Sequence, residues 1–89
     1  MSYEVFLYPR AFEFLEKCGS DLRKRIEDRL RELKENPEKQ GRQLSPSPFR
    51  RLRIGKYRAI YEINRRESKV IVLFIGHRDD VYEDFSRII

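Results

Sequence analysis

Residues 49–61 read FRRLRIGKYRAIY, and this stretch predicts the central feature of the fold. Two β-strand-like halves meet at Gly55-Lys56, and a two-residue link with glycine first is typical of a type II′ hairpin turn. The expected cross-strand pairs are Ile54 with Tyr57, Arg53 with Arg58, Leu52 with Ala59 and Arg51 with Ile60. The stretch also holds four arginines and a lysine, although like charges facing each other across a sheet are destabilising. We therefore expect a partner outside the chain to supply negative charge.

Alternation along the two strands separates their side chains onto two faces of the sheet. The apolar face, which we expect to pack on helices, carries Leu52, Ile54, Tyr57, Ala59, Tyr61 and Ile63. The cationic face, which we expect to be open, carries Arg51, Arg53, Arg58 and Ile60, with Glu62 further along. The pattern therefore predicts that the arginines share one solvent-facing surface.

The flanking sequence predicts a single domain over residues 1–89. A strand is expected at 3–8, a helix from Pro9 to Gly19, and a second helix from Ser20 or Asp21 to Asn36-Pro37. The short link between these helices predicts an antiparallel hairpin. Residues 37–48 contain three of the four prolines and are expected to form a long loop, pinned by Leu44.

The apolar run KVIVLFIGH at residues 69–77 is expected to be the central strand, buried on both faces. A short last helix is predicted after it, with Val81, Phe85 and Ile88 on its inner side. The expected fold class is α+β, with an N-terminal strand and a helical hairpin packed on a small, mainly antiparallel β-sheet, and a short C-terminal helix.

Positive charge is concentrated in the second half of the chain. The net charge is +5 at pH 7, and residues 41–58 contain six basic residues and no acidic one. A patch of one sign attracts polyanions, although a solvated charged face is the plainer alternative. We favour nucleic acid as the ligand, and expect Arg42, Arg50 and Lys56 to contact RNA.

Other classes of protein and site are disfavoured by composition. With Cys18 as the single cysteine, neither an internal disulfide nor a cysteine-based metal site is expected, and no residue cluster has metal-ligand spacing. We therefore predict no metal and no cofactor. The longest apolar run, residues 70–75, is too short to span a bilayer, and the start MSYEVFLYPR does not resemble a signal peptide. The sequence thus predicts a cytoplasmic protein without a membrane partner.

The cationic face suits the cleavage of RNA without a metal, in which the ribose 2′-OH attacks the adjacent phosphate. This reaction needs a base, an acid for the leaving 5′-oxygen, and cations to neutralise the charge that develops on phosphorus. The planar fork of arginine matches two phosphate oxygens, so Arg51, Arg53 and Arg58 are candidates for the cationic role.

Candidates for proton transfer lie in the segment GHRDDVY at residues 76–82. His77 has the intrinsic pKa that suits proton transfer near neutrality, and Arg78 adds a cation. Tyr82 could orient the base or hydrogen-bond the sugar. The alternatives are a strand-end histidine satisfied by Asp79 or Asp80, and a tyrosine that only packs in its helix.

The segments RLRIGKYRAIYEI and VIVLFIGHRDDVYE, in this order, resemble the RelE side of the RelE/ParE toxin superfamily. The resemblance covers nearly the whole chain. It implies a toxin of a type II toxin–antitoxin pair that enters the ribosomal A site and cuts mRNA without a metal, leaving a 2′,3′-cyclic phosphate. It also implies a RelB-like antitoxin that wraps the toxin, and the ribosome and mRNA as partners.

By the same resemblance, the site residues are Arg51, Arg53, Arg58, Arg78 and Tyr82. In the best-known member type, lysines stand where this chain has Arg51 and Arg53, so His77 could take over proton transfer, as a histidine near this place does in some relatives. Two other functions stay open: a ParE-like inhibitor of DNA gyrase, and a non-catalytic basic module that binds RNA or the ribosome.

Overall fold

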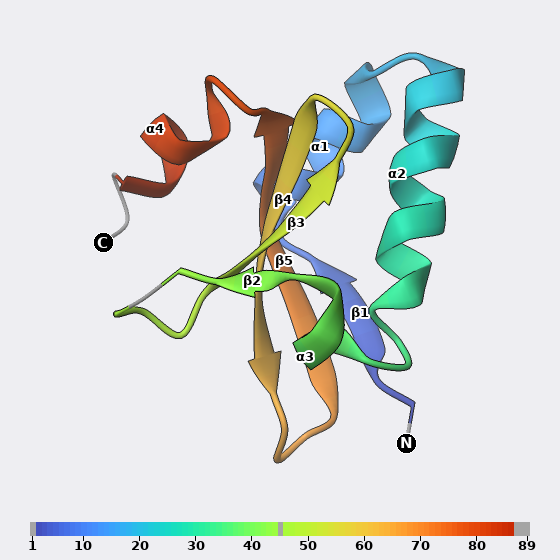
Figure 1. Cartoon of the computed structure of the whole chain (residues 1–89). Helices are drawn as coiled ribbons and strands as arrows, with labels where there is room; N and C mark the ends of the chain where they lie inside the picture. The colour runs from blue at the N-terminus through green and yellow to red at the C-terminus, as the bar shows by residue number, and fades with distance from the viewer. Residues whose placement is uncertain (1, 45, 87–89) are drawn as a thin grey trace.

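The computed structural model describes residues 2–44 and 46–86, without the side chains of residues 83–85. The elements in chain order are β1 (Glu4–Leu7), α1 (Pro9–Lys17), α2 (Ser20–Glu32), α3 (Pro37–Gln40), β2 (Arg42–Gln43), β3 (Arg50–Ile54), β4 (Tyr57–Asn64), β5 (Lys69–His77) and α4 (Val81–Ser86). Within this described part, the strands form one sheet in the order β1-β5-β4-β3-β2 (Figure 1). β1 runs parallel to β5 and the other pairs are antiparallel, which confirms the predicted α+β class.

The β3–β4 hairpin has the register that its turn predicts. Its paired residues are Ile54 and Tyr57, Arg53 and Arg58, Leu52 and Ala59, and Arg51 and Ile60. Gly55 has a φ of +60°, the left-handed conformation that a type II′ turn requires at its first central position and that glycine adopts without a steric penalty. The expected separation of apolar and cationic side chains therefore begins at this turn.

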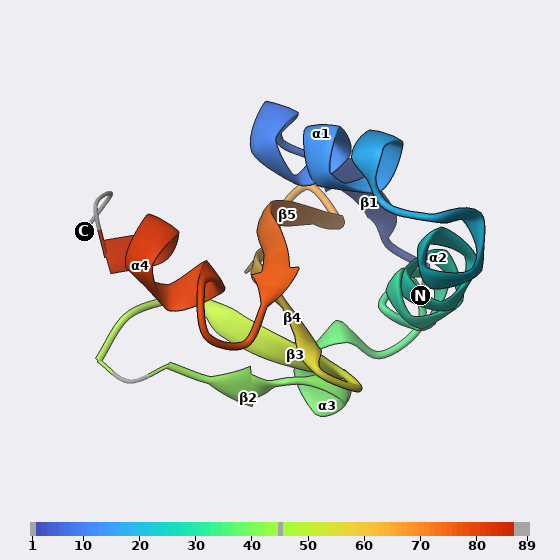
Figure 2. The same cartoon turned by 90° about the horizontal axis from the view of Figure 1, so that it is seen from above.

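The sheet carries a hydrophobic core on each face, with α1 and α2 over one face and α4 over the other (Figure 2). The larger core joins Ala11, Leu15, Ile26, Leu30 and Leu33 of the helical segment to Leu52, Ile54, Ala59, Tyr61, Val70, Val72 and Ile75 of the sheet. The smaller core consists of Ile60, Leu73, Phe74 and Val81, with Leu44, Phe49 and Tyr82 packed against it. The central strand β5 is thus buried on both faces, as predicted.

The cationic face is less open than the alternation of side chains suggests. Ile60 is fully buried within the smaller core, so only part of this face is exposed to solvent. A β-bulge is the reason that this core is so large. Ile60 pairs with Phe74 while Tyr61 pairs with Val72, which leaves Leu73 as an extra residue on β5. Leu73 and Phe74 consequently both join the smaller core.

The two N-terminal helices follow each other on one face of the sheet as the predicted helical hairpin, but their axes are inclined to each other and not closely antiparallel (Figure 1 and Figure 2). Seen from above, α2 is viewed along its axis whereas α1 lies across the view (Figure 2). α1 packs against β5 and α2 against β3, and these two strands differ in direction because the sheet is twisted. The last predicted helix is present as α4, and Val81 is buried as expected. The side chains of Phe85 and Ile88 lie outside the described residues.

The first part of the predicted loop is regular, because residues 37–43 contain α3 and the short strand β2. Pro37 occupies the first turn of α3, where a missing N–H is tolerated. The hydroxyl of Tyr61 donates a hydrogen bond of 2.6 Å to the carbonyl of Pro37. Arg50 donates through Nη2 to the carbonyl of Gly41, at 2.8 Å. These contacts come from β3 and β4, so they hold the segment against the sheet. Leu44 packs against the smaller core and anchors the end of the segment, as predicted.

Gly41 lies so close to the sheet that a side chain has no room there. A methyl group added to it would lie 2.5 Å from the Arg51 carbonyl oxygen and 2.5 Å from the Tyr61 hydroxyl. We expect Gly41→Ala to lower the free energy of unfolding by about 1–3 kcal/mol, measured by urea denaturation. Gly19→Ala is the control, since a methyl there meets no atom within 4 Å. Equal losses in the two variants would show that the close approach is not the cause.

Burial raises the pKa of the Tyr61 hydroxyl above its ordinary value of 10.0. The unfolded chain therefore releases this proton at lower pH than the folded one, and the stability that Tyr61 contributes is complete below about pH 10 and is lost above it. We expect Tyr61→Phe to cost about 1–3 kcal/mol at neutral pH. The difference in unfolding free energy between the wild type and this variant should shrink from about pH 9 to pH 11. A difference that grew over this range would contradict the assignment.

Candidate functional site

A pocket of ≈ 320 Å³ lies at the outer edge of β3. We call it the arginine pocket, and its lining residues are Arg29, Gln40, Arg42, Arg51, Arg53 and Arg58. β2 pairs with β3 only at Arg50 and Arg51, so the described strands leave residues 52–54 without a neighbour on this side. The hairpin register brings three of the arginines together, β2 supplies Arg42, and α2 reaches the pocket with Arg29.

Within the described residues, the charges of the three hairpin arginines in this pocket are not neutralised by the fold. In the described part of the chain, Arg51, Arg53 and Arg58 form no ion pair with a carboxylate. Nη1 of Arg58 donates to the carbonyls of Gly55 and Tyr57, each at 2.8 Å. Neutral acceptors of this kind orient a guanidinium and leave its charge free to bind an anion.

Tyr82 of α4 lies on the same face of the sheet as the arginines and contacts one of them. It lies in the first turn of α4, where its ring packs against the smaller core. Nη1 of Arg51 donates to the Tyr82 hydroxyl oxygen at 3.1 Å. The tyrosine therefore packs in its helix, as one of the two alternatives predicted, and its hydroxyl also contacts an arginine of the pocket.

His77 lies on the opposite face of the sheet from the arginines. It pairs directly with Tyr57, and paired residues point to the same face. The two rings meet edge to face at 5.6 Å, and Tyr57 in turn contacts Phe14 of α1. The β-bulge is the physical reason: without the extra Leu73, counting along β4 and β5 would pair His77 with Lys56 and turn it toward the arginines.

The imidazole of His77 is satisfied locally by Asp79. Its Nδ1 accepts the Asp79 backbone N–H at 3.2 Å and lies 3.4 Å from the Asp79 carboxylate. This is the strand-end arrangement that the sequence allowed as an alternative to catalysis. The structure therefore does not bring His77 to the arginine pocket.

The other predicted cations are divided among three places. Arg42 lines the pocket. The Arg78 backbone N–H donates to the Lys56 carbonyl at 2.9 Å, so these two residues lie together at the end of the hairpin, outside the pocket lining. Arg50 points to the helix-covered face and donates to the carbonyls of Glu38 and Gly41. Arg50 is thus engaged in holding α3, which differs from its predicted role in RNA binding.

Arg29 is a pocket residue that the sequence does not predict, as is Gln40. Arg29 donates through Nε and Nη2 to the Arg53 carbonyl at 3.3 and 3.2 Å, and its Nη1 forms an ion pair with Glu32. In the sequence it is one of many alternating charges on the polar face of a helix. Only the packing of α2 beside β3 brings it to the site, so no local pattern marks it.

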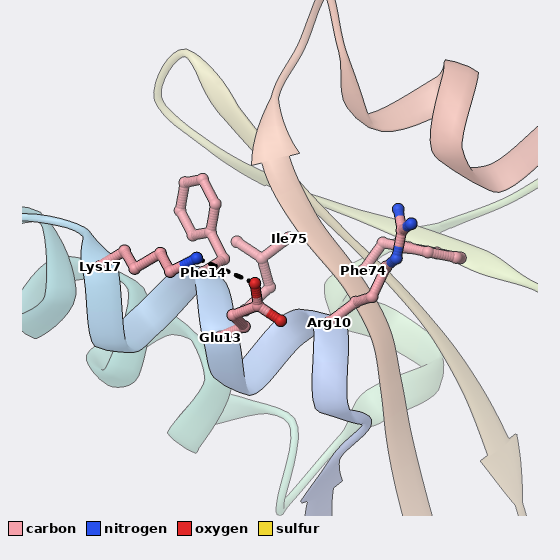
Figure 3. Close-up of a pocket in the computed structure, with 6 residues that line it drawn as sticks. All are labelled: Arg10, Glu13, Phe14, Lys17, Phe74 and Ile75. Carbon is pink, nitrogen blue, oxygen red and sulfur yellow. Dashed lines mark hydrogen bonds and ion pairs between the residues drawn. The ribbon is translucent and has the colours of Figure 1, made fainter.

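A second pocket, of ≈ 340 Å³, lies between α1 and β5 and differs in its charge (Figure 3). Its lining residues are Arg10, Glu13, Phe14, Lys17, Phe74 and Ile75. Nζ of Lys17 donates to the Glu13 carboxylate at 3.0 Å, and this contact holds the pKa of that carboxyl below its ordinary value. Because this pocket carries its own counter-charge, it is less suited to a polyanion than the arginine pocket.

Two further features concern metal and membrane binding. Across residues 2–44 and 46–86, no three histidine, cysteine, aspartate or glutamate side chains group closely enough to hold a metal ion. None of the helices described here has the length and apolar character needed to cross a membrane.

A family model described as the ParE toxin of the type II toxin–antitoxin system parDE matches residues 5–82. The chain belongs to the RelE/ParE toxin superfamily. This confirms the family that the hairpin and the GHRDDVY segment predicted, and it makes the protein a toxin of a type II toxin–antitoxin system. No curated protein sequence matches the chain.

Solved structures of RelE toxins share the fold of this RelE/ParE member. A free RelE variant from Escherichia coli is 25% identical with a TM-score of 0.80, and the match covers 100% of both chains. The toxin–antitoxin complex RelBE from E. coli is 26% identical with a TM-score of 0.75, covering 85% of this chain and 96% of that chain. RelBE2 from Mycobacterium tuberculosis is 23% identical with a TM-score of 0.78, covering 90% and 95%.

The two candidates for proton transfer can be separated by mutation. Tyr82→Phe removes the hydroxyl at the arginine pocket, and we expect it to lower toxic activity by at least about tenfold, whereas His77→Asn should stay within about twofold of the wild type. The measurement is growth rate after induced expression in bacteria, scored at equal protein level. Loss of toxicity in His77→Asn together with retention in Tyr82→Phe would reverse this assignment.

Proposed function

We propose that this toxin is a metal-independent, ribosome-dependent endoribonuclease that cuts mRNA, an mRNA interferase of the RelE type. The observation that carries the proposal is the arginine pocket with the Tyr82 hydroxyl beside it. Guanidinium groups without a counter-charge match the bidentate geometry of phosphate, and an RNA chain supplies phosphates in series. The pocket opens at a sheet edge, so an extended single strand can reach it.

In the proposed reaction, a ribose 2′-oxygen attacks the adjacent phosphorus and the bond from phosphorus to the 5′-oxygen breaks. The products are a 2′,3′-cyclic phosphate and a free 5′-OH. Negative charge grows on the phosphate oxygens in the transition state, and Arg51, Arg53 and Arg58 are placed to stabilise it. Electrostatic stabilisation of this kind is commonly the largest contribution to catalysis.

We assign to Tyr82 the donation of a proton to the leaving 5′-oxygen. Its oxygen accepts a hydrogen bond from Arg51, so its own proton is free to be given to another acceptor. Among the described residues, those that line the pocket include neither a carboxylate nor an imidazole. The proton of the 2′-OH therefore passes to solvent or to a group of the ribosome, which agrees with an activity that needs the ribosome.

The proposed partners are mRNA, the ribosome and an antitoxin of the RelB type, all met in the cytoplasm. RelE relatives have been solved as complexes with RelB from E. coli, from Pyrococcus horikoshii and from Methanococcus jannaschii. The fold shared with these toxins is the support for an antitoxin partner of this chain.

A second candidate function is inhibition of DNA gyrase, as in ParE-like members of the superfamily. The description of the matching family model favours it. One fold commonly hosts several functions, so the site must decide between them. The cationic pocket beside a tyrosine favours cleavage of RNA, because a gyrase inhibitor has no need of a site that stabilises charge on a single phosphate.

Removing a pocket arginine should abolish activity, while removing a cation elsewhere should not. We expect Arg58→Ala to lower mRNA cleavage in a translation extract by about 100-fold or more, because one donor to the developing charge is lost. Lys34→Ala is the control, since Lys34 is exposed after α2 and does not line the arginine pocket. Cleavage sites are mapped by primer extension on the mRNA.

The outcome that would favour the second candidate is equally specific. Intact mRNA with the wild-type chain, together with inhibition of purified gyrase in a supercoiling assay, would establish gyrase as the target. Equal loss of cleavage in Arg58→Ala and Lys34→Ala would instead contradict the assignment of the site.

A further inference from the structure

The arginine pocket contains more positive charge than one phosphate group can neutralise, even with Arg29 paired to Glu32. Five of its lining residues are arginines, and the proposed reaction at the cleaved phosphate uses three of them. The other two, Arg29 and Arg42, come from α2 and β2, on the outer side of β3. The charge and the position of Arg29 and Arg42 therefore both indicate a separate role for their end of the pocket.

Arginines face each other across both sides of β3. Arg53 pairs with Arg58 of β4, and Arg42 pairs with Arg51 across the β2–β3 ladder. Like charges directly opposite each other destabilise a sheet unless an anion lies between them. Two such pairs in one pocket suit two anionic groups better than one.

Arg29 is oriented toward the same end of the pocket. A guanidinium has five N–H donors. Hydrogen bonds to the Arg53 carbonyl use Nε and one N–H of Nη2, and the ion pair with Glu32 uses one N–H of Nη1. One N–H on each Nη remains for a ligand. Arg42 is exposed, and its guanidinium makes no hydrogen bond within the described residues, so all its donors are available.

We propose that Arg29 and Arg42 form a second phosphate-binding subsite, which holds a phosphate of the same RNA chain next to the one that is cleaved. This inference rests on the proposed function for its ligand, single-stranded RNA. The subsite positions the strand and strengthens binding, while the chemistry stays with the three arginines on the hairpin.

The structure also limits how far this basic surface extends. A neighbouring pocket shares Arg29 and Arg53 with the arginine pocket, and its other lining residues are Arg25, Asp28, Ile54 and Gly55. Asp28 brings a carboxylate, which also accepts a hydrogen bond of 3.0 Å from Arg31. Asp28 thus interrupts the run of arginines beside Arg29, and the proposed subsite is confined to Arg29 and Arg42 and adds one phosphate contact.

The test measures binding of a short fluorescent single-stranded RNA whose 2′-oxygens are methylated, so that it cannot be cleaved. Arg42→Gln is expected to weaken binding about tenfold, since a charge-assisted contact is lost. It should also reduce the slope of log K against log salt by about 0.7, the value for one phosphate contact on a single strand. Arg42 makes no hydrogen bond within the described residues, so this variant should keep the wild-type melting temperature.

Arg29→Gln is expected to give the same reduction in slope, with some loss of stability because it also gives up its bonds to the Arg53 carbonyl. Arg31→Gln is the matched control. Arg31 lies in the same helix and pairs with a carboxylate three residues away, as Arg29 does, but it lines a pocket with Val5 and Leu7 on another side of the molecule. Its salt slope should equal that of the wild type.

An unchanged salt slope in both Arg42→Gln and Arg29→Gln would overturn the second subsite, even if binding were weaker, because a purely structural role alters affinity without changing the number of phosphate contacts. In that case mRNA cleavage by the wild-type chain would leave the proposed function standing. A wild-type chain that neither bound this RNA nor cleaved mRNA would overturn the proposed function and the subsite together.

Discussion

The pairing of β3 with β4 is the constraint on which the site depends. A slip of one residue would carry Leu52 and Ile54 into solvent and turn the arginines into the core. Burying one leucine side chain is worth about 1.5–3 kcal/mol, whereas a facing pair of like charges costs about 0.2–1 kcal/mol. The larger core therefore holds Arg53 opposite Arg58 in spite of the repulsion between their charges. The sheet stays stable although it carries a pair of facing like charges.

The smaller core gives this cationic face its shape. It buries Ile60 and seats the first turn of α4 through Val81, which is 1% exposed. Because Val81 is fixed, the next residue along the chain, Tyr82, reaches Arg51. Apolar packing thus narrows the open cationic surface to a pocket at the edge of β3 and sets a hydroxyl beside it.

The parts of the molecule that sequence predicted are those fixed by local rules. The hairpin register follows from the two-residue turn and from the alternation of apolar and charged side chains, and residues 49–61 contain both signals. His77 could not be placed in this way, because its face depends on the extra residue Leu73 in β5, and no turn residue in the sequence marks that bulge. For a similar reason, the sequence does not predict Arg29 at the site and predicts only a loop at residues 37–48. Their positions depend on contacts with β3 and β4, such as the bond from Tyr61 to Pro37.

The same repulsion connects stability with function. A carboxylate in place of one arginine of each facing pair would relieve the strain in the free domain, but it would also neutralise the pocket. With arginine at all four positions, the domain gains its missing counter-charge only when an anion is bound. Ligands that bind only the folded state stabilise it, so the proposed phosphate chain would gain affinity both from its direct contacts and from the repulsion that it removes. Charge left uncompensated by the fold is thus the feature on which the proposed RNA site depends.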